Sequence, residues 1–148
     1  MPQIVPAALA DAVAVRECVR AAYAHYVERI GREPAPMTAD YPALIAAGEV
    51  WLIRADDGIA GVLVMRTQGS GLLVENVAVA PGRQGQGLGR ALMAFAEEHA
   101  RTEGLGEVLL YTNERMTENL RFYPALGYTE SGRGMQDGFA RVFYRKAI

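Results

Sequence analysis

The residues with the clearest chemical potential are three closely spaced glycines, Gly85, Gly87 and Gly89, between a predicted strand and a predicted helix. The first N–H groups of a helix have no partner inside it, and the helix dipole is positive at that end. Glycines there let an anion approach the backbone closely, so the pattern predicts a loop that binds a diphosphate. A turn that only joins the strand to the helix is the alternative, and the glycines alone leave it open.

Two other kinds of phosphate-binding loop are excluded by the residues that they require. A P-loop needs Gly-Lys-Ser/Thr, but the only lysine of the chain is Lys146. A dinucleotide-binding loop needs Gly or Ala at the end of G-x-G-x-x-G/A, and here that place falls on Arg90 or Leu92. Such a fold also begins with its glycine loop, whereas here the loop follows a series of predicted antiparallel strands.

The elements that position this loop are predicted from hydrophobic spacing and from turn residues. Their order mixes antiparallel hairpins with strand–helix–strand crossovers. We therefore expect an α/β fold, with a mixed, mostly antiparallel twisted sheet of six to seven strands flanked by about four helices. The predicted strands are 3–5, 50–55, 59–66, 72–79, 108–111, 128–133 and 139–145, the last two joined around 134–138. The predicted helices are 8–30, a short one from Thr38 or Asp40 to Gly48, 88–103 and 117–126, with a loop at 31–37.

The composition limits the class of protein and its partners. The 148 residues fit one domain, 1–148, and 51% apolar with 22% charged residues is typical of a soluble globular protein. A net charge of −2 argues against a nucleic acid or a membrane surface as partner. Cys18 is the only cysteine and there are two histidines, so neither a disulfide nor a metal site is expected. With no signal peptide and no apolar span, we expect a cytoplasmic protein.

Two stretches of the sequence match known motifs in the right order. The first reads Val77-Ala78-Val79-Ala80-Pro81, then Arg83-Gln84-Gly85-Gln86-Gly87-Leu88-Gly89-Arg90-Ala91-Leu92. It resembles the coenzyme A-binding motif of the GCN5-related N-acetyltransferase (GNAT) family: Arg or Gln, two variable residues, Gly, one variable residue, then Gly or Ala. The second reads Asn119-Leu120-Arg121-Phe122-Tyr123-Pro124-Ala125-Leu126-Gly127-Tyr128 and is similar to the family's Asn…Phe-Tyr…Leu-Gly-Phe helix.

The resemblance implies a GNAT fold, acetyl-CoA as co-substrate without a metal, and a set of residues that bind it. In the family, the strand before the glycine loop splays away from its neighbour, and the pantetheine arm bonds to its backbone. Backbone groups of Val77 and Val79 would make these contacts here, and an N–H near Val77 would polarise the thioester carbonyl. The matching asparagine, Asn119, would hold the pantetheine. The implied coenzyme-binding residues are Val77, Ala78, Val79, Gln84, Gly85, Gln86, Gly87, Leu88, Gly89, Arg90 and Asn119.

Two residues are candidates for the catalytic proton transfers. Asn119 and Tyr123 are four apart and share a helix face, and the family uses the matching tyrosine to protonate the departing thiolate. A half-buried core aromatic is the alternative for Tyr123, and Pro124 departs from the family pattern by disfavouring helical geometry there. Glu75 lies two residues before Val77 on the same strand face and could accept the amine proton directly or through water. A glutamate hydrogen-bonded to the next strand is the alternative.

These residues together predict an acyltransferase that moves an acetyl group from acetyl-CoA to an amine of a small molecule or peptide. We expect direct attack by the amine, because Cys18 lies within the first predicted helix and no base is near it in sequence. An acyl-CoA-binding sensor and, more weakly, a nucleotide-binding regulatory domain are the alternatives. A homodimer is left open. The expected acceptor walls are the first helix, the loop 29–40 and the tip 133–137, with Tyr26, Arg32, Glu33 and Arg133 available to a polar substrate.

Overall fold

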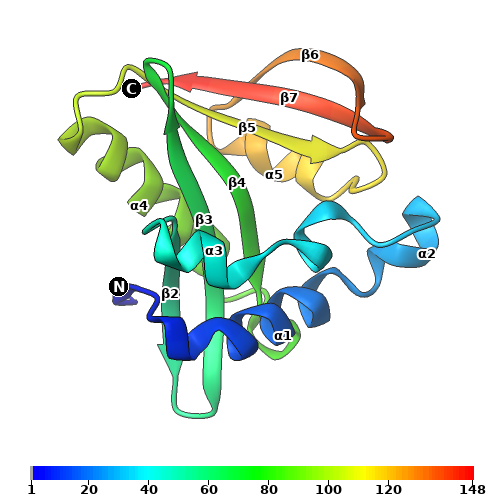
Figure 1. Ribbon diagram of the computed structural model, residues 1–148. Coiled ribbons are helices and arrows are strands. Elements are labelled where there is room, and N and C mark those ends of the chain that lie inside the picture. Colours follow the sequence, from blue (N-terminus) through cyan, green and yellow to red (C-terminus); the bar gives the residue numbers. More distant parts are fainter. Residues whose placement is uncertain (1) are drawn as a thin grey trace. The chain divides into compact units, whose positions relative to one another are not determined.

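A computed structural model describes residues 2–148 and contains a seven-stranded sheet (Figure 1). Its strand order is β1-β2-β3-β4-β5-β7-β6. The sheet is mixed because β4 and β5 pair in parallel, whereas β1–β2, β2–β3, β5–β7 and β6–β7 are antiparallel. The predicted fold class is therefore confirmed. The strands are β1 Ile4–Pro6, β2 Val50–Ala55, β3 Gly58–Gln68, β4 Gly71–Val79, β5 Glu107–Asn113, β6 Thr129–Gln136 and β7 Phe139–Ala147.

The helices flank the strands in the predicted order, with short 3-10 turns between them. The α-helices are α1 Ala12–Tyr23, α2 Tyr26–Ile30, α3 Tyr41–Ala46, α4 Leu88–Thr102 and α5 Asn119–Ala125. The 3-10 turns are η1 Leu9–Asp11, η2 Ala35–Thr38 and η3 Pro81–Arg83. Within residues 2–148, none of the helices has the length and apolar character needed to cross a membrane.

The chain forms two compact units that interleave along the sequence, and each is described by itself. The first comprises the residues up to Met65 together with Asn76–Phe95. The second comprises Arg66–Glu75 and Ala96–Ile148. The strands β3 and β4 and the helix α4 contribute residues to both units.

The first unit has its core between the β2–β3 hairpin and the helices. Val15 and Val19 of α1 are fully buried, as is Leu52 of β2. The helix α1 contacts η2 and α3, which run beside it in Figure 1. On β3, a Cβ at Gly61 would come within 3.3 Å of the Leu92 side chain, so this glycine allows the start of α4 to pack closely on the strand. That packing fixes where the helix, and the glycine loop before it, can lie.

The predicted helix 8–30 is wrong as a continuous element, because it is divided into η1, α1 and α2. The break lies at 24–25, where the N–H of Val27 bonds to the carbonyl of Ala24, three residues back, at 3.2 Å. This tighter turn places both Tyr23 and Tyr26 in the core. Gly31 ends α2 in the left-handed conformation, as its sequence position suggested. The predicted loop 31–37 also contains the start of η2.

Other boundaries were predicted closely because a local side chain sets them. Asp40 caps α3, and its carboxylate accepts a hydrogen bond from the N–H of Ala43 at 3.1 Å. The strand β2 has the predicted bounds, and β4 begins one residue before its prediction and ends at the predicted Val79. Proline at position 81 ends β4 in the turn η3.

The second unit is built on β5, β7 and β6, with α5 against β6. The predicted wide tip at 134–138 is wrong. β6 continues to Gln136, which pairs with Phe139, so only Asp137 and Gly138 form the turn. Both have positive φ, 54° and 80°, which is the geometry of a two-residue hairpin turn with an Asp-Gly sequence. Glycines at 132 and 134 lie in the exposed strand β6.

Candidate functional site

The glycine loop begins where β4 ends and leads directly into α4. Gly85 and Gly87 have φ of +81° and +79°, a region that other residues rarely adopt. A Cβ at either position would meet no atom within 4 Å, so the loop is open and its glycines are needed for backbone shape. The N–H of Ala91 bonds to the carbonyl of Gly87 at 3.0 Å, which closes the first helical turn. The N–H groups of 88–90 therefore have no acceptor within the helix, which is the arrangement that favours an anion at a helix N-terminus.

Two adjacent side chains at the start of this loop, Arg83 and Gln84, hold it in place. Arg83 forms an ion pair with Asp57, in the turn between β2 and β3, at 2.7 Å. This hydrogen bond with the guanidinium lowers the pKa of the Asp57 carboxyl. Gln84 donates from Nε2 to the carbonyl of Val79 at 3.4 Å. The loop is thus tied to the strand that precedes it and to a neighbouring hairpin.

The strand β4 loses its β5 partner part-way along. The β4–β5 ladder runs from Gly71 opposite Glu107 to Val74 opposite Leu110 and ends there, although β4 continues to Val79. Beyond that point, two carbonyls of β4 bond to side chains. The carbonyl of Val77 accepts from the Tyr23 hydroxyl at 3.0 Å, and that of Val79 accepts from Gln84.

A buried polar network supports β4 from the helical side of the first unit. The Tyr23 hydroxyl lies 2.7 Å from Oδ1 of Asn76, which is only 5% exposed. Nδ2 of Asn76 donates to the Tyr41 hydroxyl at 3.3 Å, and that hydroxyl bonds to the carbonyl of Pro36. Burial raises the pKa of Tyr41, so its hydroxyl stays protonated. This network could not be predicted from the sequence, because four separate elements (α1, η2, α3 and β4) contribute to it.

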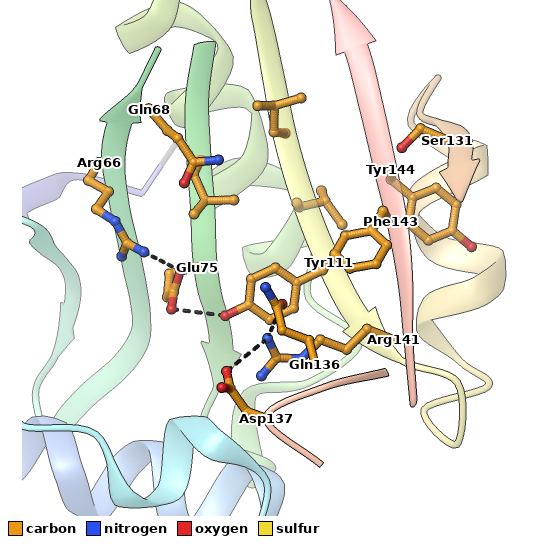
Figure 2. Close-up of a pocket in the computed structure, with 13 residues that line it drawn as sticks. Arg66, Gln68, Glu75, Tyr111, Ser131, Gln136, Asp137, Arg141, Phe143 and Tyr144 are labelled. Carbon is orange, nitrogen blue, oxygen red and sulfur yellow. Dashed lines mark hydrogen bonds and ion pairs between the residues drawn. The ribbon is translucent and has the colours of Figure 1, made fainter. Parts of the chain in front are cut away.

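The candidate base Glu75 lies on β4 within the second unit. Its Oε1 accepts a hydrogen bond from the Tyr111 hydroxyl at 2.9 Å, as Figure 2 shows. Its Oε2 lies 3.1 Å from Nη2 of Arg66, an ion pair that lacks hydrogen-bond geometry. Oε2 is buried and has no hydrogen-bond partner among residues 2–148. Glu75 therefore has the contact to the next strand that the sequence alternative described, and one oxygen that a ligand could use.

Tyr111 stays protonated and keeps its hydrogen bond to Glu75. Burial and, after it, the negative charge of Glu75 together raise the pKa of Tyr111 to about 12. The hydroxyl therefore donates to Glu75 throughout the neutral range. The two side chains therefore act as one pair.

A cavity of about 390 Å³ lies in front of this pair, in the second unit (Figure 2). Its wall comes from β3, β4, β5, β6 and β7, and most of its side chains alternate along the strands onto one sheet face. Of the predicted acceptor wall at 133–137, Gln136 and Asp137 line it. Arg133 does not, because it bonds to Glu130 on the exposed surface at 3.0 and 3.1 Å. The polar lining consists chiefly of Arg66, Glu75, Tyr111, Gln136, Asp137 and Arg141.

Arg141 is the main residue of this cavity that sequence reasoning missed. It is 6% exposed, and its Cζ lies 4.1 Å from the centre of the Tyr111 ring. The sequence feature that could have identified it is strand alternation. Arg141 is two residues from both Phe139 and Phe143, so the three side chains lie on one face of the strand. Arginine is rarely buried without a partner, so a buried strand position for it is informative.

The other predicted wall residues lie in the first unit. Glu33 forms an ion pair with Arg20, and Tyr26 is buried beside His25, with ring centres 3.9 Å apart. Neither residue lines the cavity at Glu75.

The helix α5 carries Asn119 and Tyr123 in one short stretch. Nδ2 of Asn119 donates to Thr112 at 3.0 Å. Tyr123 is buried, with its ring centre 6.0 Å from those of Tyr128 and Tyr144. Pro124 precedes the last residue of α5, and the N–H of Leu126 already bonds back to Tyr123, so the missing N–H falls where the helix ends.

Cys18 is buried in the first unit and does not line the cavity at Glu75. Burial raises the pKa of the Cys18 thiol to about 11, so it is not a thiolate at neutral pH. Among residues 2–148, no group of three His, Cys, Asp or Glu side chains could hold a metal ion.

The acetyltransferase (GNAT) domain model matches residues 46–130, which include β4, the glycine loop and α5. The chain belongs to the GNAT family. It is 45% identical to mycothiol acetyltransferase from Streptosporangium roseum over 53 residues, which are 36% of this chain and 16% of that protein. It is 30% identical to streptothricin acetyltransferase from Streptomyces lavendulae over 96 residues, or 64% of this chain and 48% of that protein. The chain thus spans less than half the length of either relative.

A solved structure confirms the GNAT fold over the full length. The PaiA N-acetyltransferase from Thermoplasma acidophilum, solved with coenzyme A, superimposes with a TM-score of 0.82. The match covers 100% of this chain and 99% of that one, at 15% identity. At that identity the likeness establishes the fold.

Proposed function

We propose that this GNAT protein is an acetyl-CoA-dependent N-acetyltransferase whose amine acceptor binds in the cavity at Glu75. The observation that carries the proposal is the open glycine loop at the start of α4, in a chain that belongs to this family. The N–H groups of 88–90 and the positive end of the helix suit the diphosphate of coenzyme A. The residues from Gln84 to Arg90 are proposed to surround it.

The pantetheine arm of acetyl-CoA is proposed to bond to backbone groups of β4. Support comes from the end of the β4–β5 ladder at Val74, since the following residues have no β5 partner in the ladder. In this proposal Val77, Ala78 and Val79 supply the backbone contacts, and an N–H near Val77 polarises the thioester carbonyl. The family match also implies a coenzyme contact for Asn119, whose Nδ2 donates to Thr112 at 3.0 Å.

The amine must lose a proton before it attacks, because alkylamines are mostly protonated at neutral pH. Glu75 is the proposed acceptor of that proton, directly or through one water. Its buried Oε2, without a hydrogen-bond donor from the described chain, supports the role. The amine nitrogen then forms a bond to the thioester carbon, and the carbon–sulfur bond breaks. The nitrogen loses its second proton to water as the amide forms, and water returns a proton to the residue that protonates the thiolate.

The departing thiolate of coenzyme A takes a proton in this scheme from Tyr123. A tyrosine has an ordinary pKa near ~10 and a thiol one near ~8.5, so the transfer needs a position that favours it. The family match supports this role, and the completion of α5 despite Pro124 is consistent with it. We predict that Tyr123→Phe lowers kcat more than it weakens coenzyme binding. An unchanged kcat would remove Tyr123 from the mechanism.

Release of free thiol from acetyl-CoA, followed across a panel of amines, tests the proposal. We expect release that depends on the amine and that Glu75→Gln reduces. A sensor that only binds acyl-CoA would bind the coenzyme tightly and release no thiol with any amine. That result would contradict the transferase proposal and favour the acyl-CoA sensor.

A further inference from the structure

Arg141 is a buried cation with donors that the protein does not use. Its Nη1 bonds to Oε1 of Gln136 and lies 3.7 Å from Oδ2 of Asp137. Its guanidinium also lies over the Tyr111 ring, as Figure 2 shows. Its hydrogen bond and its ion pair both use Nη1, and neither Nε nor Nη2 is among the buried unpartnered polar atoms of residues 2–148, so these donors are accessible from the cavity. A guanidinium carries five N–H donors in a fixed plane, so most of its donor capacity remains available.

The nearby carboxylate neutralises this cation only weakly. Asp137 is 79% exposed at its side chain, and an exposed ion pair at this distance contributes little. The ring of Tyr111 attracts the cation but supplies no hydrogen-bond acceptor to its edge. A guanidinium whose remaining donors open onto a cavity suits an anionic ligand, which can accept charge-assisted hydrogen bonds from it.

The two ends of the cavity suit ligand groups of opposite charge. At one end, Oε2 of Glu75 forms an ion pair with Arg66 at 3.1 Å but accepts no hydrogen bond from residues 2–148. At the other, Arg141 uses only Nη1, which bonds to Gln136 and lies near Asp137. Tyr111 connects them, because its hydroxyl bonds to Glu75 while its ring lies under the guanidinium. A ligand with both an ammonium and an anion satisfies both ends at once.

We propose that Arg141 binds a carboxylate of the acceptor, so that this enzyme acetylates amines that also carry a carboxylate, such as amino acids. The inference rests on the proposed function, because it assigns the acceptor of the same reaction. Arg141 is then the specificity residue. A planar guanidinium fits a carboxylate through two parallel hydrogen bonds, which a lysine in its place could not provide.

The first test compares matched acceptors. For each of the twenty amino acids, kcat/KM is measured for the acid and for its amide, which keeps the amine and removes the negative charge. The wild-type kcat/KM should be roughly 10- to 100-fold higher for the best acid than for its amide, because a hydrogen bond to a charged group contributes a free energy of that size. Arg141→Gln should bring this ratio near one. Equal rates for acids and amides in the wild type would overturn the proposal.

Two variants control for a loss of fold. Arg145→Gln removes an arginine of the same strand, which is exposed and pairs with Glu107 at 2.8 Å outside the cavity, and should keep the acid-to-amide ratio. Arg141→Lys keeps the positive charge and should retain only part of the preference. Circular dichroism and thermal melting establish that the variants are folded. A folded Arg141→Gln protein with the wild-type preference would contradict the role of Arg141.

Binding separates this inference from the proposed function. Calorimetry of the acids and amides with protein loaded with coenzyme A should show tighter binding of acids, lost in Arg141→Gln. If acids bind in this way but no thiol is released, the transferase proposal fails and the carboxylate site stands. If thiol is released with neutral amines and acids bind no better than amides, the transferase proposal stands and the carboxylate site fails. Tighter binding of ethanolamine phosphate than of any carboxylate would overturn the choice of carboxylate.

Discussion

The hydroxyl of Tyr23 lies 3.0 Å from the carbonyl oxygen of Val77, and this joins α1 to the strand proposed to bind pantetheine. The same hydroxyl is 2.7 Å from Oδ1 of Asn76. A residue of the first helix therefore fixes the backbone of β4 beyond its last pair with β5. The position of the coenzyme strand depends on a side chain more than fifty residues earlier in the chain.

Tyr23→Phe should weaken coenzyme binding through this contact. Loss of one buried hydrogen bond should destabilise the fold by about 1 kcal/mol and raise the Kd of acetyl-CoA roughly fivefold. Tyr41→Phe is the matched control, because its hydroxyl belongs to the same network but does not contact Val77. It should lower the urea midpoint similarly and leave the Kd near that of the wild type. Equal Kd values for both variants would contradict a role for Tyr23 in positioning β4.

Gly87→Val should abolish coenzyme binding beyond its effect on stability. Gly87 has φ of +79° and Gly48 has φ of +75°, and a Cβ would be free of contacts at both. Gly48→Val therefore imposes the same backbone strain, about 1–3 kcal/mol, away from the loop. We expect both variants to melt at lower temperature, but only Gly87→Val to lose acetyl-CoA affinity by roughly 100-fold or more. Retained affinity would mean that the loop is only a turn.

The sequence was most predictive where one short segment determines a feature. Adjacent residues determine the glycine loop, the Asp40 cap and the end of β4 just before Pro81. All three features are present in the structure. The strands β2 and β4 were predicted closely for the same reason. Asn119 and Tyr123 lie in one helix as expected, although their chemical roles stay predictions.

Features that depend on distant contacts were missed. The helix predicted over 8–30 breaks so that both Tyr23 and Tyr26 are buried, and helical periodicity cannot anticipate such a break. Arg141 has no motif around it, and its importance comes from Tyr111 on another strand. The hairpin tip was placed too wide because Gly134 resembles a turn residue but lies in an exposed strand.

Cys18 should be inert and dispensable. Because burial raises the pKa of its thiol to about 11, little thiolate exists at pH 8 and a disulfide reagent should label native protein far more slowly than unfolded protein. Cys18→Ala should retain amine-dependent thiol release. Rapid native labelling together with loss of turnover in the variant would indicate a covalent acyl-enzyme.

Stability should fall at alkaline pH, and Tyr111 should contribute to the loss. Its pKa is raised to about 12 by burial and then by Glu75, so the folded state retains a proton that the unfolded state loses near pH 10. The stabilisation is therefore present below about pH 10 and is lost as the pH rises towards 12. Urea unfolding of wild type and Tyr111→Phe over this range should give a shallower decline for the variant. Parallel curves would contradict the raised pKa.

Lys146→Met should destabilise the second unit through a buried ion pair. Nζ of Lys146 donates to Glu97 at 2.9 Å and to the carbonyl of Leu126, just after α5, at 2.8 Å. Because Glu97 is 9% exposed and would lose its cation, we expect a loss of about 2–4 kcal/mol in urea unfolding. Arg101→Gln breaks only the exposed pair with Glu98 and should cost less than about 0.5 kcal/mol. Similar losses for the two variants would contradict this difference.

The fate of a labelled acetyl group tests the central claim most directly. Protein, an amine acceptor and acetyl-CoA carrying a ¹³C-labelled acetyl group are incubated, and the amine, the coenzyme and the intact protein are analysed by mass spectrometry. We predict that the label appears on the amine in a one-to-one ratio with free coenzyme A and that the protein carries none. Free coenzyme A with labelled acetate and no labelled amine, or a labelled protein intermediate, would contradict direct transfer to an amine.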